Sequence, residues 1–191
     1  MNLNYFRLNE GDTVVNLGAH QGKATLFFSC AVGKSGRVIS VEPLAENFSI
    51  LERAVKRYRC DNVTLINAAI GDRDGEGNLF VGSHVSSSTT RNQGRGTQRV
   101  VVVTWDKLVQ QMRLKEVALA KVDVEGAELQ WLTGMTTLYP KHIIMEEHSR
   151  FGYELSALYE MLKNKGYKWT KKGLHIYATR EKESRLPVDD R

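Results

Sequence analysis

The stretch Asn16-Leu17-Gly18-Ala19-His20-Gln21-Gly22 decides the fold of this chain. It completes a β-branched run at residues 13–17 and opens a segment, residues 22–32, whose apolar side chains recur at helical spacing. Glycine at position 18 lets the chain turn sharply and lets a ligand approach the backbone. A strand, a glycine turn and a helix in this order predict a ligand site at the carboxyl end of a parallel strand.

The glycine stretch does not match the fingerprint of a dinucleotide site. A G-x-G-x-x-G pattern read from Gly18 places His20 and Lys23 where glycines are needed. A diphosphate would then meet side chains, so the pattern disfavours NAD and FAD.

The rest of the chain alternates between strand-like and helix-like segments, which predicts an α/β fold with a mostly parallel sheet and helices on both faces. A closing hairpin at residues 167–179 adds an antiparallel last strand. Strands are expected at 13–17, 37–42, 63–67, 119–123 and 142–147, a further hairpin from 78–81 and 99–104, and helices at 22–32, 43–58, 105–112, 129–134 and 155–162.

Bulk composition indicates a single soluble domain. The chain has 191 residues, 41% hydrophobic and 26% charged. No apolar run approaches the roughly 20 residues of a membrane span, and the N-terminus does not resemble a signal peptide. The two cysteines, Cys30 and Cys60, are too few for a disulfide framework and suit a reduced, cytoplasmic protein. Residues 1–180 are predicted to form the domain, and the charged residues 181–191 a disordered tail.

A formal net charge of +5 slightly favours an anionic partner. No nucleic-acid-binding motif accompanies this charge, so nucleic acid is a possible partner but not the favoured one. No membrane partner is expected. The oligomeric state stays open, and a homodimer is compatible with the sequence.

Glu42 ends the second predicted strand, at the spacing where an acidic residue reaches ribose hydroxyls. The alternative is that Glu42 caps the helix that follows Pro43. After the third strand, the small residues Ala68 and Ala69 would admit a flat adenine ring, with Ile70 packed on its face.

The run Lys121-Val122-Asp123-Val124-Glu125-Gly126-Ala127-Glu128, with the glycine stretch upstream, resembles the FkbM family of S-adenosylmethionine methyltransferases. The resemblance covers residues 12–179 and is supported by segments 36–43, 67–72 and 104–108. It implies a Rossmann-like class I methyltransferase domain with a seven-stranded sheet. It also implies methyl transfer, usually to a hydroxyl oxygen of a small molecule or a sugar. The cofactor-binding residues predicted from the motifs and the resemblance together are Asn16, Gly18, Ala19, His20, Gly22, Glu42, Pro43, Ala68, Ala69 and Asp123.

Asn16 departs from the family, which usually has aspartate at this position. The cofactor's ammonium group favours a charged acceptor there. We therefore expect weakened cofactor binding if Asn16 faces the ammonium group, and a catalytically inactive cofactor-binding relative is one alternative.

Candidate catalytic groups follow two neighbouring strands. A hydroxyl acceptor benefits from a general base, and the candidates are Asp123, Glu125 and Glu147, with Glu146 and His148 beside the last. Each set could instead be an acidic helix cap or the start of a solvated loop. The clustered carboxylates and the histidine could also hold a divalent metal, but we predict none, because hard-cation sites depend on a geometry that sequence does not define.

The segment 82–98 is too long and polar for a simple hairpin turn. We expect it to be a lid over the acceptor, and the alternative is a disordered surface excursion. Its arginines, Arg91 and Arg95, together with Arg99, motivate a second hypothesis, an RNA or protein methyltransferase.

Overall fold

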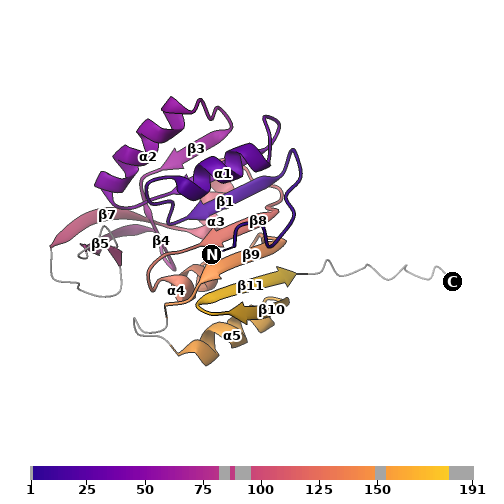
Figure 1. Ribbon diagram of the computed structural model, residues 1–191. Helices are drawn as coiled ribbons and strands as arrows, with labels where there is room; N and C mark the ends of the chain where they lie inside the picture. Colours follow the sequence, from indigo (N-terminus) through magenta and orange to yellow (C-terminus); the bar gives the residue numbers. More distant parts are fainter. Residues whose placement is uncertain (1, 82–86, 89–95, 149–153, 181–191) are drawn as a thin grey trace.

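The computed structural model describes residues 2–81, 87–88, 96–148 and 154–180. Seven strands form one sheet in the order β10-β11-β9-β8-β1-β2-β3 (Figure 1). All neighbours pair in parallel except β11, which runs antiparallel to both β9 and β10. The predicted sheet and its antiparallel last strand are therefore confirmed. The strands are β1 (Thr13–Leu17), β2 (Arg37–Val41), β3 (Val63–Ile66), β8 (Leu119–Val122), β9 (His142–Glu146), β10 (Tyr167–Lys172) and β11 (His175–Arg180).

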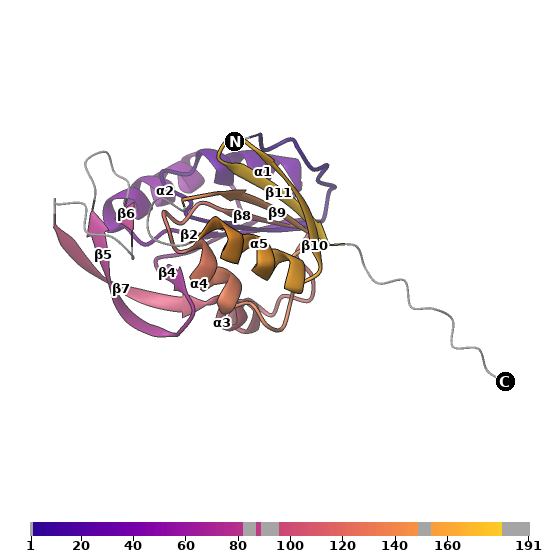
Figure 2. The ribbon, with the colours of Figure 1, turned by 90° about the horizontal axis from the view of Figure 1, so that it is seen from below.

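Helices cover both faces of this sheet, as predicted (Figure 2). One face carries α1 (Lys23–Ala31) and α2 (Ala45–Arg57), and the other carries α3 (Trp105–Met112), α4 (Glu128–Thr133) and α5 (Leu155–Asn164). Helix α2 begins two residues later than predicted, because Pro43 and Leu44 are still extended or turning. Among the described residues, no helix combines the length and the apolar character that a membrane span requires.

The larger core lies between the sheet and helices α3, α4 and α5. Trp105 and Trp131 are fully buried there and meet edge to face, with ring centroids 5.7 Å apart. The indole nitrogen of Trp105 donates to the carbonyl oxygen of Leu138 at 2.6 Å, so its polar atom is satisfied. Replacing a buried tryptophan of this kind by alanine typically costs about 3–5 kcal/mol. This packing holds the ends of β8 and β9, which carry the site described below.

A second sheet has the order β4-β7-β5-β6. Strands β5 (Gly75–Val81) and β7 (Thr97–Thr104) form the predicted hairpin, which is confirmed and is longer than expected. The sequence did not reveal β4 (Ala69–Gly71), which pairs in parallel with β7, or the short β6 (Ser87–Ser88). The pairing of β4 brings Ala69 and Ile70 beside the first sheet. The predicted lid with Arg91 and Arg95, and the predicted tail at 181–191, lie largely or wholly outside the described residues.

Candidate functional site

The turn between β1 and α1 makes a very close approach to the segment after β8. Gly18 has φ +73°, and a Cβ placed on it would lie 1.7 Å from the carbonyl oxygen of Asp123. The N–H groups of Gly18 and Ala19 both donate to the carbonyl oxygen of Val41, at 3.0 Å each. Only glycine therefore fits at position 18, and the turn is held against β2 by backbone hydrogen bonds.

Gly22 ends this turn and begins helix α1. Its φ of +100° is left-handed, and a Cβ there would lie 2.8 Å from the side chain of Leu51 on α2. Gly22 and Ala19 do not line the pocket described below. Their part in the site is to shape the turn, which allows α1 and α2 to pack closely.

Glu42 follows β2 and turns its carboxylate toward the glycine turn. The side chain is nearly buried, with 4% of the residue exposed. Oε2 accepts the N–H of His20 at 2.7 Å, and Oε1 accepts the N–H of Leu44 at 3.0 Å. Burial raises the pKa of Glu42, and the hydrogen bonds from His20, Leu44 and Asn47 partly offset this effect. A carboxylate offers about four acceptor positions. Hydrogen bonds from His20, Leu44 and Asn47 occupy three of them, so about one remains for a ligand.

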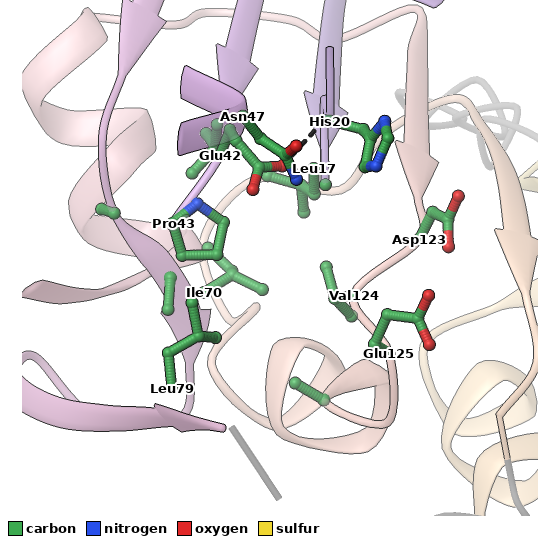
Figure 3. A pocket seen from close by; sticks show the side chains of 15 residues that line it. Leu17, His20, Glu42, Pro43, Asn47, Ile70, Leu79, Asp123, Val124 and Glu125 are labelled. Carbon is green, nitrogen blue, oxygen red and sulfur yellow. Dashed lines mark hydrogen bonds between the residues drawn. The ribbon is translucent and has the colours of Figure 1, made fainter. Parts of the chain in front are cut away.

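A pocket lies at the carboxyl ends of β1, β2 and β8 and has about 650 Å³ of empty space when the open solvent at its mouth is included. Ligands of open α/β sheets bind at such strand ends. Figure 3 shows Glu42, Pro43 and Asn47 on one side of the pocket and Asp123 and Glu125 on the other. Its lining consists of Leu17, Gly18, His20, Val41, Glu42, Pro43, Asn47, Ala68, Ala69, Ile70, Leu79, Asp123, Val124, Glu125 and Ala127.

The wall beside Pro43 is made of small and apolar side chains. Ala68, Ala69, Ile70 and Leu79 are all buried and line the pocket. Alanines at 68 and 69 leave space next to Ile70, which suits a flat ring. The sequence pointed to both alanines, but Leu79 comes from the second sheet and carried no signal of its own.

Asn16 does not face this pocket, which corrects the expectation that it meets the cofactor's ammonium group. The side chain is fully buried, and Nδ2 donates to the hydroxyl oxygen of Thr25 on α1 at 3.0 Å. Alternation along β1 explains this, because Asn16 shares a face with Val14, which packs with α1, whereas Leu17 reaches the pocket.

Lys121, the third residue of β8, links the glycine turn to the acidic side of the site. Its ammonium group donates to the carbonyl oxygen of Gly18 at 2.8 Å and to Oδ2 of Asp123 at 3.2 Å. The lysine is buried, so neither bond is screened strongly by solvent. Lys121 thus fixes the position of the Asp123 carboxylate relative to the turn.

A carboxylate–imidazole cluster, made of Asp123, Glu125, Glu128, Glu146 and His148, lies beside the pocket. Nδ1 of His148 is 2.7 Å from Oε1 of Glu128. An ionised carboxylate can only accept, so the imidazole donates this hydrogen bond. Nε2 of His148 lies 3.5 Å from Glu125, 3.8 Å from Glu146 and 4.0 Å from Asp123. The cluster can therefore hold a proton or another cation at Nε2.

The pKa values in the cluster follow from this crowding of charge. Burial raises the pKa of Glu125, the charge of His148 lowers it, and nearby carboxylates raise it further. Burial lowers the pKa of His148, but the hydrogen bond and charge of Glu128 and the charges of Glu125 and Asp123 outweigh burial and raise it. Glu125 also has a left-handed φ of +50°, an uncommon backbone conformation for a residue with a side chain.

Glu147 does not join the cluster, which corrects its prediction as a base at this site. Only 5% of it is exposed, and Oε2 pairs with Nζ of Lys171 at 3.0 Å. Its N–H donates to the carbonyl oxygen of Leu174 at 2.8 Å, which extends the β9–β11 pairing by one residue. The neighbouring His148 reaches the site instead, and the sequence analysis had placed it only beside the candidates.

Of the predicted site residues, the structure gathers eight around one pocket: Gly18, His20, Glu42, Pro43, Ala68, Ala69, Asp123 and Glu125. Sequence reasoning missed Asn47 and Glu128. Asn47 looked like an ordinary helix residue, and Glu128 looked like an acidic residue in a first helical turn. Only tertiary structure places them against Glu42 and His148.

A methyltransferase family model and several solved structures match this chain. The family model described as the methyltransferase FkbM domain matches residues 16–169. A methyltransferase FkbM from Methylobacillus flagellatus is 16% identical with a TM-score of 0.64, and the match covers 92% of this chain and 45% of that one. This chain thus spans less than half of that protein.

Two further solved structures share the fold. Fibrillarin from Aeropyrum pernix, in complex with natively bound S-adenosyl-L-methionine, is 16% identical, with a TM-score of 0.55 over 91% of this chain and 69% of that one. Precorrin-6y C5,15-methyltransferase from Geobacter metallireducens is 14% identical, with a TM-score of 0.55 over 92% and 82%. No curated protein sequence matches the chain significantly.

Proposed function

We propose that this chain, which belongs to the FkbM methyltransferase family, is an S-adenosylmethionine-dependent methyltransferase that methylates a hydroxyl oxygen of a small molecule or a sugar. The observation that carries this proposal is that carboxylates lie on two opposite sides of one pocket. Glu42 lies on one side, where a ribose can bind, and Asp123 and Glu125 lie on the other.

The pocket residues fit S-adenosylmethionine. Glu42 keeps acceptor capacity for a ribose hydroxyl, Gly18 allows a ligand to approach the backbone, and the wall at Ala68 and Ala69 has room for adenine. The cofactor supplies a methyl group that is already activated on a sulfonium. The protein therefore has to align the acceptor oxygen and exclude water.

Asp123 and Glu125 are placed to serve the acceptor. An oxygen–carbon bond forms as the sulfur–carbon bond breaks, and the hydroxyl proton must leave the acceptor. Asp123 and Glu125 both line the pocket, so either carboxylate is placed to accept this proton. His148 does not line the pocket and acts on these carboxylates through its charge.

The charges around the site support a neutral acceptor over RNA. Asp123, Glu125 and Glu146 give the acceptor side an acidic character, which repels a polyanion. Arg99 does not line the pocket and pairs with Glu76 on the exposed surface of the second sheet. The reason for suspecting an inactive relative also weakens, because Asn16 does not line the pocket.

The proposal is tested by incubating the protein with S-adenosylmethionine and separate panels of sugars, other hydroxylated small molecules, RNA and peptides. Formation of S-adenosylhomocysteine and a methylated product is measured by mass spectrometry. We expect turnover only with a hydroxylated small molecule or sugar, and turnover confined to RNA or peptides would contradict the proposal.

Two variants then test the acidic residues. Asp123→Asn or Glu125→Gln should lower turnover by roughly 10²–10⁴-fold if that residue is the base. Glu125→Gln should do so with unchanged affinity for S-adenosylhomocysteine. Glu160→Gln, on the exposed face of α5, is the matched control. Full activity in both amide variants would leave alignment as the only contribution of this side of the site.

A further inference from the structure

We propose that the carboxylate–imidazole cluster is a divalent cation site in which Asp123, Glu125 and His148 are the protein ligands. The role of this cation, which is to hold the acceptor hydroxyl beside the cofactor, rests on the proposed function. The site itself is inferred from the structure alone.

The ligand atoms converge. One carboxylate oxygen each from Asp123 and Glu125 and one imidazole nitrogen of His148 all lie within 4.8 Å of one another. A cation placed between atoms at such separations can contact all three with little movement of the side chains. Carboxylate oxygens suit Mn²⁺ and Mg²⁺, and imidazole nitrogen suits Zn²⁺ and other transition metals, so this mixed set of donors admits Mn²⁺, Zn²⁺ or Mg²⁺.

Glu128 provides a second and independent observation. It is fully buried, holds Nδ1 of His148 at 2.7 Å and also accepts the N–H of Gly126 at 3.2 Å. A histidine that binds a metal typically donates its other ring N–H to a carboxylate in this way. The hydrogen bond turns Nε2 toward Glu125 and Asp123, which is the orientation that a metal ligand needs. Oε2 of Glu128, in the same buried position, has no hydrogen-bond partner in the part of the chain that the structure describes.

Carboxylates are concentrated around His148. Four carboxylates surround His148, namely Asp123, Glu125, Glu128 and Glu146. Among the described residues, Lys121 contacts Asp123 and His175 lies 3.4 Å from Glu146. Carboxylates gathered in a protein interior are normally paired or bound to a metal.

The position of the cluster explains what the cation would do. Asp123 and Glu125 line the pocket, whereas His148 and Glu128 stand behind them, so a cation held by the first two faces the acceptor. A divalent cation orients a hydroxyl oxygen and lowers its pKa, and thereby favours the loss of its proton. The same cation would screen the repulsion between the two carboxylates.

The test measures metal binding by the full chain without cofactor or acceptor. Chelator-treated protein is titrated with Mn²⁺, and the loss of the electron paramagnetic resonance signal of free Mn²⁺ reports binding. We expect one site per chain, with competition by Zn²⁺ and Mg²⁺. Asp123→Asn and His148→Gln should each weaken Mn²⁺ binding at least 10-fold, and Glu128→Gln, which acts through His148, should weaken it by about 10–100-fold.

His142→Gln is the matched control. His142 is the first residue of β9, whereas His148 follows the last residue of the same strand. Thermal unfolding identifies any variant that fails to fold, and Asp123→Asn, which alters a partly exposed side chain, keeps the test valid if His148→Gln is unstable. Absence of stoichiometric Mn²⁺ binding, or binding that both variants leave unchanged, overturns the site.

The failure of this inference can be told from the failure of the proposed function. Methyl transfer to a hydroxyl that continues unchanged in excess chelator, without Mn²⁺ binding, overturns the cation site and leaves the proposed function standing. Mn²⁺ binding that depends on Asp123 and His148, in a protein that methylates only RNA or peptides, supports the site and overturns the proposed acceptor.

Discussion

Replacing Gly18 by alanine should damage the site far more than an ordinary glycine substitution. The added Cβ would lie 1.7 Å from the carbonyl oxygen of Asp123 and 2.8 Å from its carbonyl carbon. Contacts of a Cβ below 3.0 Å are essentially never observed, so the two backbones must separate by at least about 1.3 Å. The atoms that must move belong to the glycine turn and to the residue that carries a predicted catalytic carboxylate.

The magnitude has two parts. A left-handed φ costs alanine roughly 1–2 kcal/mol, reduced by about 0.4–1 kcal/mol because alanine also restricts the unfolded chain. Forcing extra volume into a packed position adds about 1–3 kcal/mol. We therefore expect Gly18→Ala to lower the free energy of unfolding by about 1–5 kcal/mol, with a central value of about 3 kcal/mol. Misplacement of reacting groups by about 1 Å costs on the order of 100-fold in rate, so kcat/KM should fall at least that far.

Gly173→Ala separates the cost of the left-handed backbone conformation from the cost of the close contact. Gly173 also has a left-handed φ, +61°, but a Cβ there would meet no atom within 4 Å. Its substitution should lower the free energy of unfolding by only about 1 kcal/mol and leave methyl transfer unchanged. Urea denaturation followed by circular dichroism gives the stabilities, and calorimetry with S-adenosylhomocysteine gives cofactor affinity.

The comparison refutes the reasoning if Gly18→Ala and Gly173→Ala behave alike. Equal losses of stability would mean that the turn and Asp123 can separate freely. Normal kcat/KM in Gly18→Ala would mean that the close approach has no part in positioning the reacting groups.

Three further changes test other parts of the site and fold. Glu42→Gln should weaken binding of S-adenosylhomocysteine by about 1.5–3 kcal/mol, measured by calorimetry, whereas the exposed Glu46→Gln should not. Asn16→Asp should not tighten cofactor binding. It should lower the free energy of unfolding by about 3 kcal/mol at neutral pH, because it buries a charge. Burial would raise the pKa of the new carboxyl group, so acid should relieve this loss of stability. Burial acts to raise the pKa of Asp106, but hydrogen bonds from Thr136 and Thr137 outweigh it and lower that pKa. The stability that Asp106 contributes is then present above its unfolded pKa of about 3.9 and is lost as pH falls through its lower folded pKa. Asp106→Asn should therefore lower the free energy of unfolding by about 1 kcal/mol at pH 7, measured by urea titration, and this difference should vanish in acid.

The cofactor side of the site was predictable because its determinants are local. Gly18 and Glu42 each follow a strand that the sequence pattern reveals, and parallel strands bring their carboxyl ends to one edge of the sheet. The expectation for Asn16 was conditional on the side chain facing the ammonium group, and the alternation of β1 indicates that Asn16 lies on the other face from the pocket. Val14 and Asn16 share a face, and Leu17 lies on the other.

The acceptor side was only partly predictable because it depends on contacts between distant segments. Glu128 and His148 meet across 20 positions of sequence, from the first turn of a helix and from the end of a strand. Alternation after β9 could have separated Glu147 from Glu146 and His148, but it does not show that Lys171 receives Glu147. The strand β4 likewise forms only because β7 provides its partner.

The position of Asp123 explains why the two halves of the site have to be considered together. Its backbone carbonyl leaves no room for a side chain at position 18, and its carboxylate shares Lys121 with the carbonyl oxygen of Gly18. Oδ1 of the same carboxylate lies 4.0 Å from His148, on the acceptor side. A shift of the glycine turn must therefore also move a member of the carboxylate–imidazole cluster. Cofactor affinity and acceptor turnover should accordingly respond together to changes at Gly18 or Lys121, whereas a change at His148, which touches only the acceptor side, should separate them.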